Sequence, residues 1–477
     1  MSLIHPRIIV SALKGGSGKT IVSLGLISLW REQGHKVSPF KKGPDFIDAG
    51  WLGLAAAYPC YNLDPYMMNQ EQIIQSFIKR SAHTDISLIE GNRGLFDGFD
   101  LEGHCSTAEL GKMLKAPVIL IVDVTMSTRT IAALVLGCKK FDPDLEMVGV
   151  ILNRVAGVRQ ENIVRQSIDR YCQMPVLGSI PKLKSNPFPE RHMGLVPQQE
   201  RKQAEKALAW SRKVIEDHLD TKMIFQLSQK VRPIKGFKPD DRGKPGVKED
   251  RTSPAIGFIR DRAFWFYYPE NLEQLAQMGT KLIELNSMSD KGLPKLDGLY
   301  IGGGFPETQA KSLSQNTAFR QALRDRIEKG LPVYAECGGL IYLGESLILK
   351  DKSYPLVGAL PISFVLEKKP QGHGYTFLEV EAENPYFQVG ETIKGHEFHY
   401  SRPIINNPDK LKTVFRVKRG NGLDGHIDGL MYKNLLATYT HIHAAGNTFW
   451  ADHFIKIASF YKNNKKVKNF SNSEKRH

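Results

Sequence analysis

The sequence predicts an α/β protein with two α/β domains. Three observations carry this prediction: the length of the chain, a βα alternation in its first part, and a second such alternation after residue 254. The 477 residues exceed what one core usually holds, since domains average about 150 residues. Hydrophobic residues make up 41% and charged residues 24% of the chain, which is typical of a globular protein in water.

Short apolar runs rich in β-branched residues alternate with helical patterns through the first domain. Such runs are typical of strands that are buried on both faces, so we predict a parallel sheet with helices on both sides. The predicted strands are residues 7–12, 36–40, 86–90, 118–124, 147–153 and 176–180. The predicted helices include residues 21–33, 71–81 and 129–139.

A segment rich in Gly, Pro and charged residues, 236–254, is predicted to be a linker. The first domain then spans residues 1–235 and the second 255–461. In the second domain we predict strands at 255–261, 298–304 and 332–336, a β-rich region, and a closing helix at 448–461. Residues 462–477 hold six Lys or Arg against one Glu, and we predict a basic disordered tail there.

Composition limits the classes of function. No apolar run reaches the roughly 18 residues of a membrane span, and the N-terminus lacks the pattern of a signal peptide. We therefore predict a cytoplasmic protein without a membrane partner. The net charge of +15 favours anionic ligands, and the basic tail is better explained as a solvated tail than as a nucleic-acid arm. Five scattered cysteines contain no CxxC pair, which argues against a disulfide framework or a zinc site.

The stretch IIVSALKGGSGKT places a glycine-rich turn between a strand and a helix. Its backbone N–H groups and the positive end of the helix are suited to phosphate, which predicts ATP binding. A Rossmann loop is excluded because Ile21 stands where a third glycine is needed. The predicted nucleotide-binding residues are Lys14, Gly15, Gly16, Ser17, Gly18, Lys19 and Thr20.

Within this loop, Lys19 would neutralise the β and γ phosphates and the Thr20 hydroxyl would bind Mg²⁺. The additional Lys14 is typical of the deviant P-loop of dimerising ATPases, so a homodimer is possible. Asn153, which ends another predicted strand, is a candidate for adenine contact.

Carboxylates follow two predicted strands at the same edge of the sheet as the phosphate loop. We predict Asp45 and Glu90 as Mg²⁺ ligands, directly or through water. Asp48 and Asp97 are candidates to position the second substrate. A single Asp in a turn is usually explained by turn chemistry, but two such loops beside a P-loop favour a site.

Three basic residues lie in the same two loops: Lys41, Lys42 and Arg93. They are candidates to meet carboxylates of the substrate. Ordinary surface charge is an equally good explanation for them at this stage.

The stretch PVYAECGGLIYLGES indicates a nucleophile elbow, because an apolar strand ends just before Cys337 and two glycines and a helix follow. A base is expected from TYTHIHAAGN, where we prefer His441 and keep His443 as the alternative. Backbone N–H groups of Gly338 and of the GGGFPE loop, at Gly303, are candidates for the oxyanion hole.

Together, KGGSGKT, FKKGPDFID, EGNRGLFDG, YIGGGFPE, AECGGL, GHEFHYS and YTHIH resemble the cobyrinic acid a,c-diamide synthase family over nearly the whole chain. The resemblance implies an ATP-binding domain similar to dethiobiotin synthetase, joined to a class I glutamine amidotransferase domain. It implies ATP- and glutamine-dependent amidation of the a and c acetate side chains of cobyrinic acid.

By motif, the resemblance assigns the glutaminase nucleophile to Cys337 and its base to His441. Many class I amidotransferases carry Glu two residues after that histidine, where this chain has His443, so we predict a Cys–His dyad rather than a triad. Relatives act on sirohaem or nickel sirohydrochlorin, and the motifs leave the choice of tetrapyrrole open. A DNA-partition-type ATPase is the rival of another class, but such a protein has no use for a cysteine elbow.

Overall fold

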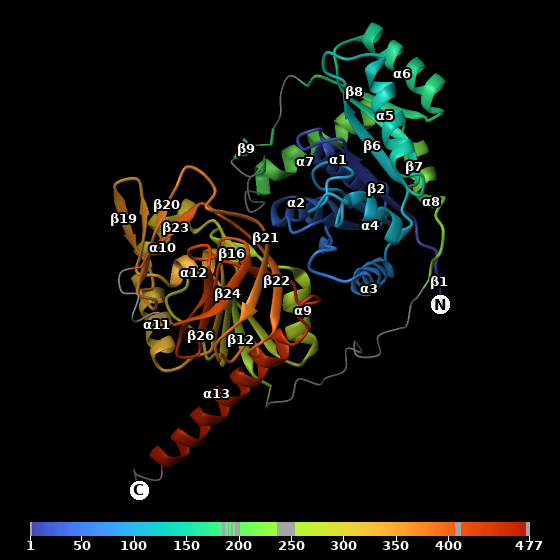
Figure 1. Cartoon of the computed structure of the whole chain (residues 1–477). Helices are drawn as coiled ribbons and strands as arrows, with labels where there is room; N and C mark the ends of the chain where they lie inside the picture. Colours follow the sequence, from blue (N-terminus) through green and yellow to red (C-terminus); the bar gives the residue numbers. More distant parts are fainter. Residues whose placement is uncertain are drawn as a thin grey trace. The chain divides into compact units, whose positions relative to one another are not determined.

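The computed structural model divides into two compact units, Met1–Pro239 and Asp240–His477 (Figure 1). Their boundary falls within the segment predicted as a linker, most of which lies outside the described residues. The structure describes residues 2–183, 187–188, 190–191, 194–195, 201–235, 253–405 and 412–473.

A seven-stranded parallel sheet forms the centre of the first unit, in the order β4-β3-β5-β2-β6-β7-β8. Its central strands are buried along almost their whole length, which explains why they contain so few polar residues. The strands are β2 (Arg7–Ala12), β3 (Val37–Lys42), β4 (Tyr61–Leu63), β5 (Ile86–Glu90), β6 (Val118–Asp123), β7 (Met147–Val155) and β8 (Val176–Pro181).

Helices connect these strands, and α1 packs against both α2 and α7 (Figure 1). Two of the helices start at side-chain caps: Asp45 caps α2, and Asn69 and Gln72 form a capping box on α3. The helices are α1 (Lys19–Glu32), α2 (Phe46–Ala56), α3 (Gln70–Ser81), α4 (Thr107–Leu114), α5 (Thr130–Phe141), α6 (Val158–Cys172), α7 (Arg201–His218) and α8 (Thr221–Gln229). Short strand pairs join β1 (Ser2–Leu3) to β11 (Ile234–Lys235) and β9 (Glu190–Arg191) to β10 (Gly194–Leu195).

The second unit is built on a ten-stranded mixed sheet, in the order β14-β12-β15-β17-β26-β25-β24-β21-β22-β27. The first five strands are parallel, and the others pair antiparallel. The strands are β12 (Ala255–Ile259), β14 (Lys281–Leu285), β15 (Gly298–Ile301), β17 (Val333–Glu336), β21 (Gly372–Val380), β22 (Thr392–His399), β24 (Lys412–Arg419), β25 (Ile427–Tyr432), β26 (Leu435–Thr438) and β27 (His441–Ile442).

Smaller elements complete the second unit. A two-stranded pair joins β13 (Phe264–Phe266) to β16 (Gly303–Gly304), and a four-stranded sheet joins β18 (Ser346–Leu349), β19 (Lys352–Pro355), β20 (Ile362–Leu366) and β23 (Ser401–Ile405). The helices are α9 (Pro269–Gln277), α10 (Ala310–Gln315), α11 (Thr317–Glu328), α12 (Gly338–Leu343) and α13 (Trp450–Ser473), with a 3₁₀ turn at Pro306–Gln309.

Side chains of β17 alternate between two cores. Val333 and Ala335 lie in one core, which also contains Cys337, whereas Tyr334 lies in the other with Tyr300. By the same alternation, Glu336 faces the core that holds Tyr334. Two successive residues of this turn thus reach opposite sides of the sheet.

The observed strands of the first domain agree closely with the predicted ones, whereas the closing helix differs. Residues 7–12 and 86–90 coincide with β2 and β5, and the other strands predicted in the first domain differ from the observed ones by two residues or fewer at each end. The closing helix is longer than predicted, because α13 continues to Ser473 into the segment that we predicted to be a disordered tail. No Gly or Pro follows Gly446, so the sequence offers no residue that would end the helix early.

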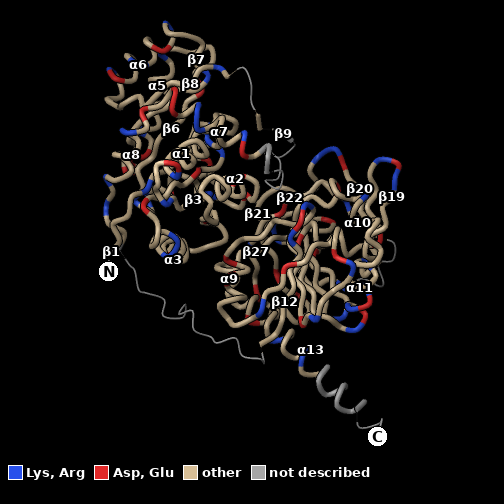
Figure 2. Tube along the Cα trace, turned by 180° about the vertical axis from the view of Figure 1, so that it is seen from behind, with Lys and Arg blue, Asp and Glu red and all other residues tan. Residues whose placement is uncertain are grey.

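Charged residues of both signs are interspersed along both units (Figure 2). Among the described residues, no helix has the length and apolar character needed to cross a membrane.

Candidate functional site

The phosphate loop lies between β2 and α1, as predicted. Gly16 and Gly18 adopt positive φ angles of 71° and 97°, which glycine adopts at little cost. The Lys19 ammonium donates to the backbone oxygens of Arg93, at 2.7 Å, and of Lys14, at 3.3 Å. Lys19 is therefore held across the mouth of the loop, while the side chain of Lys14 is exposed.

The loop lines a cavity of about 660 Å³ in the first unit. Its lining combines the loop glycines and the charged residues Lys19, Lys41, Asp48 and Glu90 with apolar residues that include Leu183, Phe188 and Trp210. This combination of charged and apolar lining residues suits a nucleotide.

Four of the predicted residues that line this cavity contact one another. The Thr20 hydroxyl donates to Glu90 Oε1 at 3.0 Å, and the Lys41 ammonium lies 2.8 Å from the same oxygen and 2.7 Å from Asp48 Oδ2. Within the described residues, the buried Glu90 Oε2 has no hydrogen-bond partner. An oxygen left in this way beside a threonine hydroxyl fits a site for Mg²⁺ with its waters.

Burial and the contacts between charged groups both shift the pKa values of this cluster. Burial raises the pKa of Glu90, and it raises the pKa of Asp45 to about 7 with help from the neighbouring Asp48. For Asp48 burial is the largest influence and acts in the same direction, but the Lys41 ammonium and hydrogen bonds with Lys41, Asp45 and Glu90 together hold the pKa below its usual value. Burial alone would lower the pKa of Lys41, yet Asp48 and Glu90 raise it above the usual value, so Lys41 stays charged.

Two other predicted carboxylates of these loops, Asp45 and Asp97, accept hydrogen bonds from backbone N–H groups. Asp45 Oδ1 accepts from the N–H groups of Ile47 and Asp48, so one of its oxygens is used to cap α2. Asp97 is exposed, and its Oδ2 accepts from the N–H of Gly94 at 2.8 Å.

Arg93 is exposed and has a positive φ of 50°, whereas Lys42 is buried, which lowers its pKa. Lys41 is fully buried between two carboxylates. A substrate carboxylate therefore has to compete with Asp48 and Glu90 for Lys41, while Arg93 is open to solvent.

Asn153 braces the phosphate loop. Its Nδ2 donates to the backbone oxygen of Ser17 at 2.8 Å, and its Oδ1 accepts from the N–H of Arg154 at 2.9 Å. Asn153 also lines the nucleotide-sized cavity, so its predicted contact with adenine stays a prediction. Arg154, which the sequence reasoning did not select, pairs with Asp123 at 2.7 Å and donates to the Gly16 oxygen at 3.2 Å.

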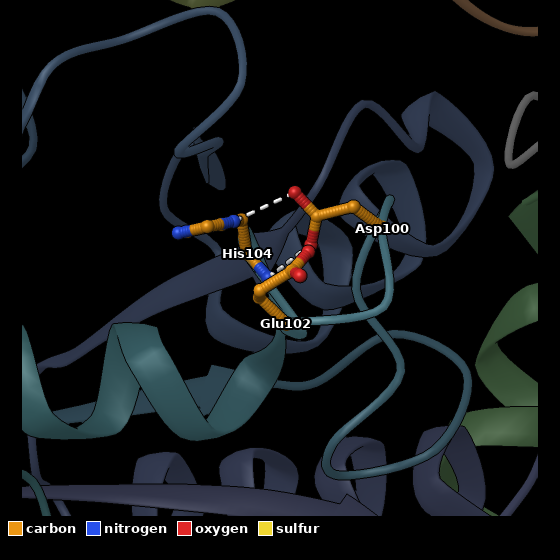
Figure 3. A group of neighbouring side chains, drawn as sticks. All are labelled: Asp100, Glu102 and His104. Carbon is orange, nitrogen blue, oxygen red and sulfur yellow. Dashed lines mark hydrogen bonds and ion pairs between the residues drawn. The ribbon is translucent and has the colours of Figure 1, made fainter.

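An exposed cluster close to Asp97 in the sequence contains three residues of types that can bind a metal ion. Ligand atoms of Asp100, Glu102 and His104 lie within 4.8 Å of one another (Figure 3). However, Asp100 accepts from both the backbone N–H and Nδ1 of His104, at 2.9 and 2.6 Å. Asp100 and His104 are thus already hydrogen-bonded to each other within this turn, and we assign no metal to it.

Cys337 stands on a strained turn between β17 and α12, as expected of a nucleophile elbow. Its φ of 46° and ψ of −95° are unusual for a residue with a side chain. A Cβ at Gly339 would meet the Ile301 oxygen at 2.5 Å and one at Gly338 would meet the Gly304 nitrogen at 3.0 Å. The two glycines therefore allow the backbone approach that the elbow requires.

The thiol is largely covered, since Cys337 is only 4% exposed. Its Sγ donates to the Phe398 oxygen at 3.7 Å. Burial, reinforced by the carboxylates of Glu307 and Glu397, raises the pKa of the thiol, and a hydrogen bond from the Gly338 backbone opposes this. Cys337 is accordingly a thiol near pH 7, and a base must remove its proton.

His441 lies beside the same glycines. A Cβ at Gly303 would come within 2.3 Å of His441 Cε1, and Gly338 adjoins Gly303 and Gly304 from the cysteine side. Gly338, next to Cys337, and His441 thus share the backbone of β16 as a common neighbour.

His441 has a carboxylate partner that the sequence reasoning did not propose. Glu336 Oε2 lies 3.3 Å from His441 Nδ1, and both side chains are buried. His396, on the adjacent strand β22, stacks on the His441 ring with the centroids 5.0 Å apart. Burial and His441 keep the pKa of His396 well below its usual value, so His396 is neutral.

His443, the alternative base, belongs to a separate contact. Its Nδ1 accepts from the N–H of Ala445 at 3.2 Å, and its Nε2 lies 3.5 Å from Glu270.

Comparison with known proteins identifies both domains of the chain. A CobQ/CobB/MinD/ParA nucleotide binding domain matches residues 8–196, and a CobB/CobQ-like glutamine amidotransferase domain matches residues 255–449. The cobyrinate a,c-diamide synthase of Magnetococcus marinus is 42% identical over 449 residues, which cover 94% of this chain and 96% of the relative. Those of Archaeoglobus fulgidus and Dehalococcoides mccartyi are 39% and 36% identical and cover 97% and 99% of the relatives.

The chain belongs to the cobyrinate a,c-diamide synthase family.

Membership of the cobyrinate a,c-diamide synthase family confirms the predicted resemblance and the class of the protein. The chain is an ATP-dependent carbon–nitrogen ligase that takes its nitrogen from glutamine. The predicted fold is confirmed as well: a P-loop domain on a parallel sheet is followed by an amidotransferase-like α/β domain.

Glu336 is the main neighbour of a predicted catalytic residue that the sequence reasoning missed. A signal was present, because a carboxylate ends an otherwise apolar strand immediately before the nucleophile. The sequence does not show, however, that His441 returns to this strand end from more than 100 residues away.

Proposed function

We propose that the chain amidates the a and c acetate carboxylates of cobyrinic acid, with ATP, Mg²⁺ and glutamine. The observation that carries this proposal is the presence, in one chain, of a phosphate loop with buried carboxylates and of a cysteine elbow with a neighbouring imidazole. The relatives named cobyrinate a,c-diamide synthase cover nearly the whole chain and support the choice of substrate.

The first unit activates the carboxylate. The loop N–H groups and Lys19 bind the phosphates of ATP, and a side-chain carboxylate of the macrocycle attacks the γ-phosphorus, which yields ADP and an acyl phosphate. Thr20, Glu90 and Asp45 would hold Mg²⁺, which when bound neutralises phosphate charge. Ammonia then attacks the acyl carbon and phosphate leaves, which produces the amide.

The second unit supplies the ammonia. His441 removes the proton of the Cys337 thiol, whose pKa is raised, as the sulfur attacks the amide carbon of glutamine. The N–H groups of Gly338 and Gly303 stabilise the oxyanion. The imidazolium returns its proton to the leaving ammonia, and water then hydrolyses the thioester to glutamate and free thiol.

Substrate contacts in the first unit are assigned by charge and exposure. Arg93 is open to solvent and suits a peripheral carboxylate of the macrocycle, with Asp48, Asp97, Lys41 and Lys42 in the same loops. Lys14 is exposed on the phosphate loop and supports a homodimer in which it reaches the nucleotide of a second copy.

Mass spectrometry of the products tests the proposal. With glutamine, ATP and Mg²⁺, cobyrinic acid should lose about one dalton per amide formed, in two steps, whereas sirohaem and nickel sirohydrochlorin should stay unchanged. Cys337→Ser should stop glutamine-dependent amidation and retain amidation with added ammonia. Loss of both activities in a folded Cys337→Ser protein would contradict the two-site scheme, and amidation of another tetrapyrrole alone would redirect the substrate assignment.

A further inference from the structure

The carboxylate at the end of β17 has the geometry of a positioning group. Glu336 Oε2 lies 3.3 Å from His441 Nδ1 and also accepts from the Tyr300 hydroxyl at 3.0 Å. Glu336 Oε1 accepts from the N–H of Ile442 at 3.2 Å. One buried carboxylate thus binds both the ring and the main chain beside it, which fixes where the imidazole can point.

A second layer of contacts fixes this carboxylate. The Asn271 amide donates to the Tyr300 hydroxyl at 3.2 Å and to the Ile442 oxygen at 2.9 Å, and its Oδ1 accepts from the N–H of Ala444 at 2.8 Å. Tyr300 is buried in the aromatic core against Tyr334 and Trp450. The strand end that bears His441 and the strand end that bears Cys337 are therefore tied together through Glu336.

We infer that Glu336, the residue immediately before the nucleophile, orients the catalytic base His441 and takes the place of the acidic residue that position 443 lacks. The site then works as a Cys337–His441–Glu336 triad rather than as the dyad predicted from the sequence. This inference rests on the proposed glutaminase function. Glu336 acts through its contact with His441, so it is a positioning residue.

The chemistry follows from the acceptor character of the carboxylate. With Glu336 accepting at Nδ1, the neutral ring carries its proton there and leaves Nε2 free to receive the thiol proton. The imidazolium formed in that step is stabilised by the negative charge of Glu336. Another buried histidine–carboxylate pair, His443 and Glu270, lacks this arrangement, because Nδ1 of His443 accepts a backbone hydrogen bond and only Nε2 faces the carboxylate.

Glu336→Gln is the informative substitution. If its amide oxygen keeps the bond from the Ile442 N–H, its NH₂ group faces His441 and favours the wrong tautomer. If the amide is reversed, its NH₂ group meets the Ile442 N–H instead. We expect the kcat for glutamine hydrolysis to fall about 100-fold or more with KM changed less than threefold, and we expect Glu336→Asp to retain part of the rate.

The matched control is Glu270→Gln, which removes another buried carboxylate next to a histidine of the same segment. It should leave glutamine hydrolysis within twofold of the unaltered protein. Amidation with added ammonia should be unchanged in both variants, which reports on folding and on the ATP site.

A direct readout observes the His441 ring in the protein with Glu336 intact. In protein with ¹⁵N-labelled histidine, the His441 signal, assigned with His441→Gln, should show a protonated Nδ1 near neutral pH. A ring protonated at Nε2 alone would overturn the inference, as would a folded Glu336→Gln protein with the unaltered kcat. If instead Cys337→Ser still hydrolyses glutamine, the proposed glutaminase itself fails, and the two failures are thereby distinguished.

Discussion

Lys41 and Glu90 face each other across the neighbouring strands β3 and β5, with Lys41 Nζ 2.8 Å from Glu90 Oε1. The register of the sheet pairs these two residues directly, and Asp48 closes the arrangement from α2. Lys41 is 1% exposed and Glu90 is fully buried, so each charge is compensated by the other rather than by water. A cation thus already sits among the carboxylates that we propose for Mg²⁺.

Lys41→Met should destabilise the first unit by about 3–5 kcal/mol, because it leaves the buried carboxylates without their counter-charge. Calorimetry without nucleotide should show a lower Tm for the unfolding of the first unit. That transition is identified in the unaltered protein because ATP raises its Tm. Because Mg²⁺ could then compensate the freed carboxylates, we expect it to raise the Tm of Lys41→Met more than that of the unaltered protein. Lys213→Met, which breaks an exposed pair with Asp217, is the control and should change stability by less than about 0.5 kcal/mol.

Asn153→Ala should distinguish loop bracing from recognition of adenine. If Asn153 acts by holding the Ser17 oxygen, the variant should bind ATP, GTP and tripolyphosphate all about tenfold more weakly, since one hydrogen bond of the loop is lost. Calorimetric titration with the three ligands measures this. Weaker binding of ATP alone would instead identify Asn153 as an adenine contact. Asn69→Ala, which removes the cap of α3, should leave all three affinities unchanged.

Gly303→Ala should impair glutamine hydrolysis and spare the ATP site. The added Cβ would lie 2.3 Å from His441 Cε1, so the imidazole has to move away from its place beside β16. Moving the imidazole of a catalytic base out of its position should lower kcat about 100-fold. Amidation with added ammonia should persist, and Gly292→Ala, where no atom lies within 4 Å of the added Cβ, should behave like the unaltered protein. Normal glutaminase kinetics in Gly303→Ala would place His441 outside the reaction.

Local sequence patterns predicted most of the fold and only part of the candidate site. β2 and β5 were recoverable because parallel strands buried on both faces must be apolar and β-branched. The phosphate loop and the cysteine elbow were recoverable because each needs glycines at fixed offsets within one short segment. The end of α13 was not, because a basic composition is typical of tails and also compatible with a helix.

Contacts between distant segments escaped the sequence reasoning. Lys41 stays a predicted substrate contact, but the sequence reasoning did not find that the register of β3 and β5 pairs it with Glu90. Glu336 was predicted only as the end of a strand, because its partner His441 lies more than 100 residues further along the chain. Pairing between strands decides both outcomes, and no pattern within a single segment encodes it.

The Cys337 thiol should resist alkylation near neutral pH. Burial and the carboxylate of Glu307 raise its pKa above the ordinary value of 9.0, so little thiolate is present at pH 7. Iodoacetamide labelling followed by peptide mass spectrometry should show slow modification of Cys337 that accelerates only above pH 9. Glu307→Gln should shift this profile to lower pH, because it removes one of the neighbouring charges. Rapid labelling at pH 7 would mean that a resident thiolate, rather than a base-assisted thiol, attacks glutamine.

Asp45→Asn should separate stability from function in the first unit. Burial raises the pKa of Asp45 to about 7, whereas the unfolded chain has the ordinary value of 3.8. The folded state therefore prefers the protonated acid, and the stability contributed by this group is complete below pH 3.8 and is lost as the pH rises through 7. Asn keeps the oxygen that caps α2 and carries no charge, so it avoids this loss.

Calorimetry without ATP or Mg²⁺ should accordingly show a higher Tm for Asp45→Asn than for the unaltered protein at pH 8, and a smaller difference at pH 5. Amidation should decrease in the same variant, because the carboxylate that we propose for Mg²⁺ is gone, while glutamine hydrolysis in the second unit should continue. Residues that are kept at a cost in stability are typical of functional sites. If Asp45→Asn has the same Tm as the unaltered protein at pH 5 and at pH 8, then Asp45 is ionised at no cost in the folded protein. If Asp45→Asn keeps full amidation activity, then Asp45 does not belong to the proposed metal site.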